Sequence, residues 1–128
     1  MNGFYIRPRI DWELLHQYAE GLICLSACLA GDIPRKIVNG DYNAAKEKAL
    51  ELRELFGEDG FYLELQDHGI PDERRAAQGI IRIHQETGIP LVVTNDAHYL
   101  RREDARTHMT LVLLKPLVEE RKLIVRVP

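Results

Sequence analysis

Asp96 and His98 stand two residues apart at the end of the apolar run Leu91–Val93. In an extended chain, side chains at positions i and i+2 point the same way, so this carboxylate and this imidazole would face one spot. Parallel α/β proteins place metals and catalysis at the C-terminal ends of their strands. The spacing is short, and the alternative stays open that Asp96 caps the next helix and His98 is a surface residue.

Two further strand ends carry polar side chains. One expected strand ends in Ser26-Ala27-Cys28, and another ends in Gln66-Asp67-His68-Gly69. Thiolate, imidazole and carboxylate groups are ligands for zinc and, with less sulfur, for manganese or iron. If the three ends meet at one edge of a sheet, they could form a metal site. Cys28 could equally be an inert buried thiol, and His68 could simply be a turn residue.

The other cysteine and histidines receive no chemical role. Cys24 lies inside an expected strand and is predicted to be a buried small apolar residue. His16 and His84 are expected on the solvent sides of their helices, and His108 has no assigned function. The charged run 119–122 is typical of a solvated surface.

Three apolar runs predict strands, namely Leu22–Ser26, Phe61–Leu65 and Leu91–Thr94. The last run lacks alternation, which is typical of a strand covered on both faces. Helical patterns lie before, between and after these runs, and the order predicts βαβ units with parallel strands.

Capping residues and apolar spacing locate the expected helices. A short helix follows Asp11, with Gly21 after it, and Asp32 with Pro34 predicts a single helical turn before the turn at Asn39-Gly40. The longer helices are expected after Asp41, after an Asp72 cap, and over about 102–114. The helix after Asp41 is expected to have one apolar face, made of Ala45, Ala49, Leu52 and Phe56. The helix after Asp72 is expected to have Ala76, Ile80 and Ile83 on one face.

Composition limits the class of protein. The chain has 128 residues, 45% hydrophobic and 29% charged, which excludes a disordered tail and a disulfide scaffold. Its net charge of −3 differs from the basic charge usual for a chain that binds duplex DNA by itself. No apolar run reaches the roughly 18 residues of a membrane span, and the first residues lack a signal-peptide core. A reducing cytoplasm is the simplest compartment, with no membrane partner.

Four strings of this sequence closely resemble the PHP (polymerase and histidinol phosphatase) domain of the alpha subunit of bacterial DNA polymerase III. They lie at 3–11, at 21–31 (GLICLSACLAG), at 61–69 (FYLELQDHG) and at 94–100 (TNDAHYL). The resemblance runs in order from about Gly3 to about Leu113. It implies an α/β fold, a partial, distorted, TIM-like β/α barrel with about three parallel strands alternating with helices.

The resemblance also implies site residues and cofactors. Cys28 resembles a family metal ligand at a strand end, and Asp96 and His98 resemble the family's D-x-H pair, whereas His68 falls on no ligand position. The implied cofactors of the intact domain are divalent metal ions, zinc or manganese, with magnesium as a further choice. These three residues would be a minority of the family's ligand positions.

The resemblance covers only the C-terminal part of the family's domain. The early strands with the H-x-H motif and the polymerase core are not matched, so residues 1–114 are expected to be part of a PHP domain and 115–128 a divergent tail. The expected function is that of a fragment of a metal-dependent phosphoesterase module in a replicative polymerase, whose parent could carry 3′–5′ exonuclease activity. The fragment is expected to be inactive alone. The alternatives are a non-catalytic structural or interaction module and, more remotely, an unrelated small α/β binding protein.

The same resemblance implies partners. They are the rest of the polymerase alpha subunit, DNA through the parent protein, and other replisome subunits. Open sheet edges also predict self-association.

Overall fold

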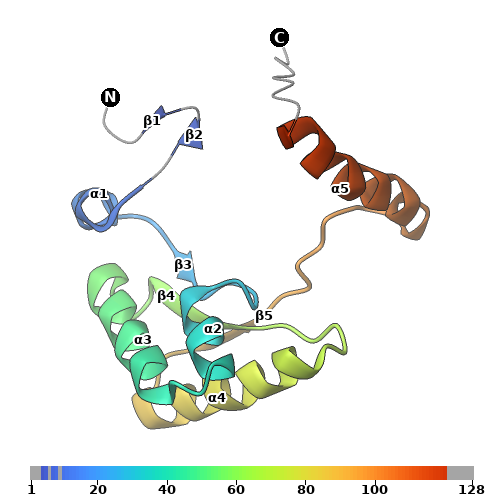
Figure 1. Ribbon diagram of the computed structural model, residues 1–128. Helices are drawn as coiled ribbons and strands as arrows, with labels where there is room; N and C mark the ends of the chain where they lie inside the picture. The colour runs from blue at the N-terminus through green and yellow to red at the C-terminus, as the bar shows by residue number, and fades with distance from the viewer. Residues whose placement is uncertain (1–3, 6, 9, 121–128) are drawn as a thin grey trace. The chain divides into compact units, whose positions relative to one another are not determined.

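The computed structural model describes residues 4, 5, 7, 8 and 10–120, with only the backbone described for the first four and the last six of these. The chain divides into two compact units, residues 1–95 and 96–128 (Figure 1). The first unit holds the sheet and most helices. The second holds one long helix.

Three short strands form a parallel sheet in the first unit. They are β3 (Cys24–Leu25), β4 (Phe61–Leu65) and β5 (Leu91–Val93), in the order β3-β4-β5. Cys24 pairs with Phe61, and Leu63 pairs with Leu91. The predicted α/β class, the parallel direction and the strand order are therefore confirmed.

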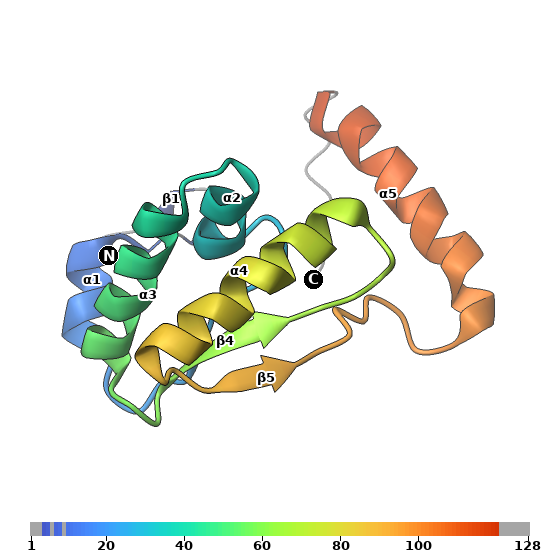
Figure 2. The same ribbon diagram turned by 90° about the horizontal axis from the view of Figure 1, so that it is seen from below.

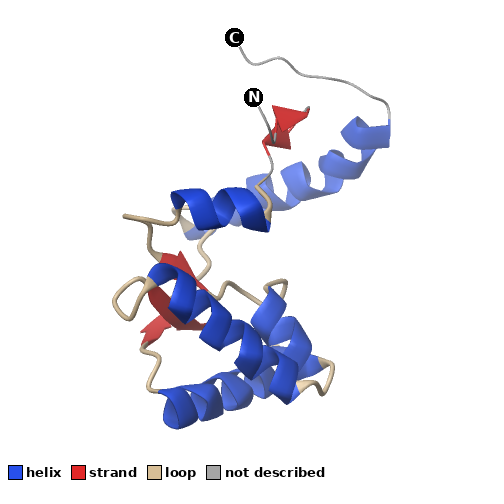
Figure 3. Cartoon of the chain, turned by 90° about the vertical axis from the view of Figure 1, so that its left-hand side faces the viewer, coloured by secondary structure: helices blue, strands red, loops and turns tan. Residues whose placement is uncertain are grey.

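Three helices gather on one face of this sheet (Figure 2, Figure 3). They are α2 (Asp32–Val38), α3 (Tyr42–Phe56) and α4 (Pro71–Thr87). Phe61 and Leu63 are two positions apart along β4, so their side chains lie on the same face of the sheet, toward the helices. Both are fully buried. They form one core with buried residues of the helices and of the loop before β5, namely Ile33, Ile37, Ala45, Ala49, Ile80, Ile83 and Ile89.

Capping residues mark several helix ends where the sequence predicts them. Asp41 Oδ1 accepts a hydrogen bond from Ala44 N at 3.1 Å at the start of α3. Gly88 ends α4 in the left-handed conformation, with φ +73°, and its N–H donates to His84 O. A residue with a side chain would be strained there, which explains the glycine.

The N-terminal segment adds a hairpin and a short helix. β1 (Phe4–Tyr5) pairs antiparallel with β2 (Arg7–Pro8), a pairing that the sequence did not predict. Asp11 caps α1 (Trp12–Tyr18) as predicted, accepting from Leu14 N at 2.9 Å. The apolar side of α1 is only partly covered, since Tyr18 is 60% exposed.

Two predicted element boundaries are wrong. The turn expected at Asp32 and Pro34 continues as the seven-residue helix α2, whose Ile33 and Ile37 reach the core. Asp72 does not cap α4, because the helix already begins at Pro71 and Ile70 holds the N-cap position. Proline suits the first helical position, since its missing N–H would have no partner there.

The strand boundaries and the cover of β5 also differ from prediction. β3 has two residues rather than the five of Leu22–Ser26, and Leu22 and Ile23 are exposed. β5 was expected to be covered on both faces, but Val93 is 76% exposed. The apolar run therefore indicates a strand, but not the burial of both of its faces.

The second unit consists of a 3₁₀ turn, Arg102–Asp104, followed by α5 (Ala105–Glu120). The start agrees with the helix predicted from about 102, and the helix continues past the predicted end at 114. Residues 121–128 of the expected tail lie outside the described residues. None of the helices described is both long enough and apolar enough to cross a membrane.

Candidate functional site

The candidate site begins with the sheet edge at which the three parallel strands end. β3 leads into Ser26-Ala27-Cys28, β4 into Gln66-Asp67-His68, and β5 into Thr94 and Asn95. Because the strands are parallel, these segments leave the sheet at the same edge. The sequence prediction that polar residues meet at one edge is confirmed for these three segments.

A buried polar network ties the three strand ends together. Ser26 Oγ accepts a hydrogen bond from Glu64 N at 2.8 Å and so joins β3 to β4. Glu64 Oε1 accepts from Gln66 Nε2 at 3.1 Å and from the Thr94 hydroxyl beyond β5. Gln66 Nε2 also donates to Thr94 Oγ1 at 3.1 Å. Ser26 and Glu64 are both buried, so each depends on these partners.

Sequence reasoning missed this network. Its one signal is Glu64, a carboxylate inside the otherwise apolar strand Phe61–Leu65. Charged residues are seldom buried without partners, so such a position predicts a hydrogen-bonded network at that point of the sheet.

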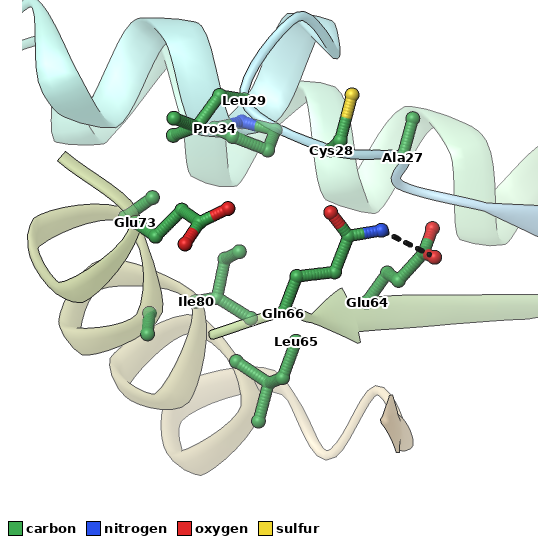
Figure 4. A pocket seen from close by; sticks show the side chains of 11 residues that line it. Ala27, Cys28, Leu29, Pro34, Glu64, Leu65, Gln66, Glu73 and Ile80 are labelled. Atoms are coloured by element: carbon green, nitrogen blue, oxygen red, sulfur yellow. Dashed lines mark hydrogen bonds between the residues drawn. The ribbon is translucent and has the colours of Figure 1, made fainter. Parts of the chain in front are cut away.

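A pocket adjoins this network, with about 260 Å³ of empty space including the part open to solvent. Cys28, Glu64, Gln66 and Glu73 line it together with apolar residues of α2 and α4. Figure 4 shows the Gln66 amide between the carboxylates of Glu64 and Glu73, with Cys28 in the loop that follows β3. The pocket therefore combines an amide and two carboxylates beside an apolar wall, and the sulfur of Cys28 at its rim points away from them in Figure 4.

The loop that carries Cys28 is tightly folded. Ala27 lies in the left-handed region with φ +66°, which turns the chain directly before Cys28. Gly31 N donates to Cys28 O at 2.7 Å, and a Cβ on Gly31 would lie 2.4 Å from Ser26 O. Only glycine fits this close approach, so Gly31 maintains the turn that holds Cys28. The Cys28 side chain is half-buried.

His68 and Glu73 form a second polar contact at this edge. Both Glu73 oxygens are engaged by His68: Oε2 accepts from His68 N at 2.7 Å, and Oε1 lies 2.8 Å from Nδ1. The other ring nitrogen, Nε2, lies 2.9 Å from Asn95 O. The hydrogen bond from the His68 ring, followed by that from its backbone, lowers the pKa of the Glu73 carboxyl from its ordinary value. Glu73 is therefore a buried carboxylate with a histidine partner.

Asp96 and His98 lie close together in the second unit. The His98 ring places Nδ1 2.6 Å from Asp96 O and 4.0 Å from Asp96 Oδ1. A proton on Nδ1 that is donated to this carbonyl leaves the Nε2 lone pair for a metal ion. Metal-binding histidines commonly have this arrangement, with the second ring nitrogen bonded to a backbone carbonyl. Both side chains are substantially exposed.

The side-chain types of Cys28, Asp96 and His98 are suitable ligands for a divalent metal ion. Asp96 and His98 would supply an oxygen and a nitrogen ligand, and Cys28 would add a sulfur of the kind that zinc accepts. Within the part of the chain that the structure describes, no three histidine, cysteine or acidic side chains are grouped closely enough to hold an ion. The assignment of Cys28, Asp96 and His98 to one site therefore stays a prediction.

Cys24 and the remaining histidines lie outside the candidate metal site. Cys24, which was expected to be buried, is half-buried and packs against the core, and burial raises the pKa of its thiol. His16 is exposed as predicted. His84 is not simply solvated as predicted: it is half-buried, and its Nδ1 lies 2.7 Å from Ile89 O. The ring of His108 lies 5.5 Å from that of His98, measured between centroids.

The sequence identifies the family to which this chain belongs. The PHP domain model matches residues 1–68, more than half of the chain. The chain therefore belongs to the PHP domain family.

Curated relatives agree with this assignment. The chain is 50% identical over 105 residues to the DNA polymerase III subunit alpha of Treponema pallidum. This match covers 82% of this chain and 9% of the relative. It is 46% identical over 114 residues to that of Borreliella burgdorferi, covering 89% of this chain and 10% of the relative. The chain is 40% identical over 115 residues to the same subunit of Thermus aquaticus, and the match covers 90% of this chain and 9% of the relative. The chain thus spans about a tenth of the length of the curated relatives it matches.

Proposed function

We propose that this chain is part of the PHP module of a bacterial replicative DNA polymerase, and that the module is a metal-dependent phosphoesterase. The observation that supports this most is the common edge of β3, β4 and β5, from which the chain leads into Cys28 and, one residue past Asn95, into Asp96. Similarity to polymerase alpha subunits over most of the chain supports the replicative setting.

Three side chains would act at this site. Cys28, Asp96 and His98 would hold a divalent ion, zinc or manganese in the first place, with magnesium the poorer match to a thiolate. A bound ion would supply Lewis-acid activation of water and of a phosphoester oxygen. The protein's part is to orient these ligands, and the Ser26–Glu64–Thr94 network supports the strand ends that lead to them.

The parent polymerase would supply the partners. We infer contacts with the rest of the alpha subunit, with DNA through that subunit, and with other replisome subunits, in the cytoplasm. If the parent removes nucleotides from DNA 3′ ends, this module is where that reaction would occur.

A non-catalytic structural module is the second candidate. It is favoured by the Ser26–Glu64–Thr94 network, whose hydrogen bonds tie the strand ends together through protein groups alone. Metal binding separates the two candidates, because a structural module has no need to bind an ion with Cys28.

Cobalt titration tests the proposal. Cobalt replaces zinc in many sites and gives an intense absorption when a thiolate binds it. We expect this absorption with the wild-type chain and its loss in Cys28→Ser. Cys24→Ser is the matched control, since Cys24 is also half-buried but lies inside β3, and it should keep the absorption. Absence of thiolate absorption in the wild-type chain would favour the structural module.

An activity assay completes the test. With Mn²⁺ or Zn²⁺, the chain alone should hydrolyse single-stranded DNA or a small phosphodiester slowly or not at all, because Cys28, Asp96 and His98 are a minority of the ligand positions of the family and an incomplete site does not fix its ions and water. Robust turnover that Asp96→Ala abolishes, and that the surface variant Asp72→Ala leaves unchanged, would show that the chain is active without other parts of the polymerase.

A further inference from the structure

We propose that His68 is a positioning residue that holds the backbone at Asn95, from which the chain enters the Asp96–His98 ligand pair. This inference rests on the proposed metal site. It gives a role to a histidine that falls on no ligand position of the family and that could otherwise simply be a turn residue.

The first step is the anchoring of His68. Glu73 lies in the first turn of α4, is buried, and accepts from both the backbone N–H and the ring of His68. Glu73 N in turn donates to Ile70 O at 3.1 Å. The ring orientation is therefore set by a helix that packs against the sheet, rather than by the loop alone.

The second step concerns the protons of the ring. The carboxylate of Glu73 and the carbonyl of Asn95 can only accept hydrogen bonds, and they face Nδ1 and Nε2 at 2.8 Å and 2.9 Å. A ring that satisfies both contacts carries a proton on each nitrogen. Such a ring has no lone pair for a metal ion, so His68 supports the site without being one of its ligands.

The third step is the need for support at Asn95. Among the described residues, the last backbone bond from this segment to β4 runs from Thr94 N to Leu65 O at 3.1 Å. One residue later the His68 ring contacts Asn95 O, and the next residue, Asp96, has a φ of +45°. A non-glycine residue persists in this left-handed region only where its surroundings maintain it. Two side-chain contacts are placed to do so: His98 Nδ1 lies 2.6 Å from Asp96 O, and the His68 ring holds the preceding residue at Asn95 O.

The consequence is an indirect effect on the ligands. Groups that orient metal ligands commonly change metal affinity by about 10- to 100-fold when they are removed. We therefore expect His68→Ala to weaken cobalt binding by about that factor. His68→Gln should recover part of the affinity, because the glutamine amide can donate to a carbonyl.

The experiment uses the 128-residue chain and cobalt, with absorption as the readout. His84→Ala is the matched control: it also removes a histidine that contacts a backbone carbonyl, but at the other end of α4. Circular dichroism and thermal melting establish that each variant is folded. If His68→Ala is not folded, Glu73→Gln, which weakens the anchor of the ring, takes its place in the comparison.

The outcomes separate the two hypotheses. Weaker binding in His68→Ala, partial recovery in His68→Gln and unchanged binding in His84→Ala support the positioning role. Equal binding by wild type, His68→Ala and His84→Ala overturns the role of His68 and leaves the metal site intact. A wild-type chain that shows no cobalt–thiolate absorption overturns the metal site itself, and the role of His68 with it.

Discussion

At the scale of single residues, Glu86 shows how charge partners stabilise the helical layer. Its carboxylate contacts Lys46 Nζ on α3 and Arg82 Nε on α4, each at 2.8 Å. The hydrogen bond from Lys46, followed by that from Arg82, lowers the pKa of Glu86 to about 2. Because the folded-state pKa lies below that of the unfolded chain, Glu86 stabilises the fold above the unfolded pKa, and this contribution is lost as the pH falls through about 2.

The direction of this pH dependence predicts how the Glu86→Gln variant should behave. At pH 6 the variant should unfold at lower urea concentration than the wild type, and the difference should shrink as the pH approaches 2. Urea unfolding followed by circular dichroism at several pH values measures it. Glu54→Gln, which changes an exposed carboxyl of α3, should show no such trend. A wild-type advantage that stays constant down to pH 2 contradicts the prediction.

The D-x-H pair shows what residue spacing can and cannot predict. The two side chains do lie near each other, with His98 Nδ1 4.0 Å from Asp96 Oδ1. The expectation assumed an extended backbone, however, and the φ of +45° at Asp96 is not extended. The imidazole is instead oriented by the Asp96 carbonyl. Left-handed residues other than glycine leave little trace in a sequence, so this detail could not have been predicted.

At the scale of elements, Gly79 allows α4 to approach α2 closely. A Cβ at position 79 would lie 2.5 Å from Ile37 Cγ2, and Ile37 belongs to the core. Gly79→Ala gains about 1 kcal/mol of helix propensity but costs about 1–3 kcal/mol for overpacking. We expect a net loss of stability of about 1 kcal/mol, measured by urea unfolding.

Two controls test whether the contact with Ile37 causes the loss of stability in Gly79→Ala. Gln78→Ala, one residue earlier and exposed, should change stability little. In an Ile37→Ala background, which removes Cγ2, the substitution at Gly79 should become stabilising. If Gly79→Ala destabilises equally in both backgrounds, the contact with Ile37 is not the reason.

Element prediction succeeded where caps and periodicity were both present. Asp41 and Gly57 bound α3, and Ala76, Ile80 and Ile83 form the buried face of α4, as the sequence indicates. It failed at α2, whose apolar residues Ile33 and Ile37 are too few for a periodic pattern and are stabilised by contacts with the other helices. The β1–β2 pairing was also missed, because two-residue strands carry almost no pattern.

At the scale of the whole molecule, the sheet has apolar residues in contact with solvent. Within the described residues, β3 and β5 each pair with β4 alone, and Val93 of β5 is 76% exposed. Exposed edge strands promote association between chains. We therefore predict concentration-dependent self-association of the purified chain, measured by sedimentation velocity.

Val93→Lys should reduce this association, because a lysine on an edge strand opposes pairing. Ile81→Lys changes an exposed apolar residue of α4 and serves as the matched control. It should leave the association constant nearly unchanged. A chain that sediments as a monomer over the whole accessible concentration range would contradict the prediction.

We propose that Cys28, Asp96 and His98 bind one metal centre, and anomalous X-ray scattering from a crystal of the chain grown with zinc would test this proposal. We predict an anomalous peak about 2.3 Å from Cys28 Sγ and about 2.0–2.2 Å from His98 Nε2 and an Asp96 carboxylate oxygen. A structure with Cys28 and His98 at opposite edges of the sheet, or with zinc bound elsewhere and these three residues free of it, would show that they do not form one metal site.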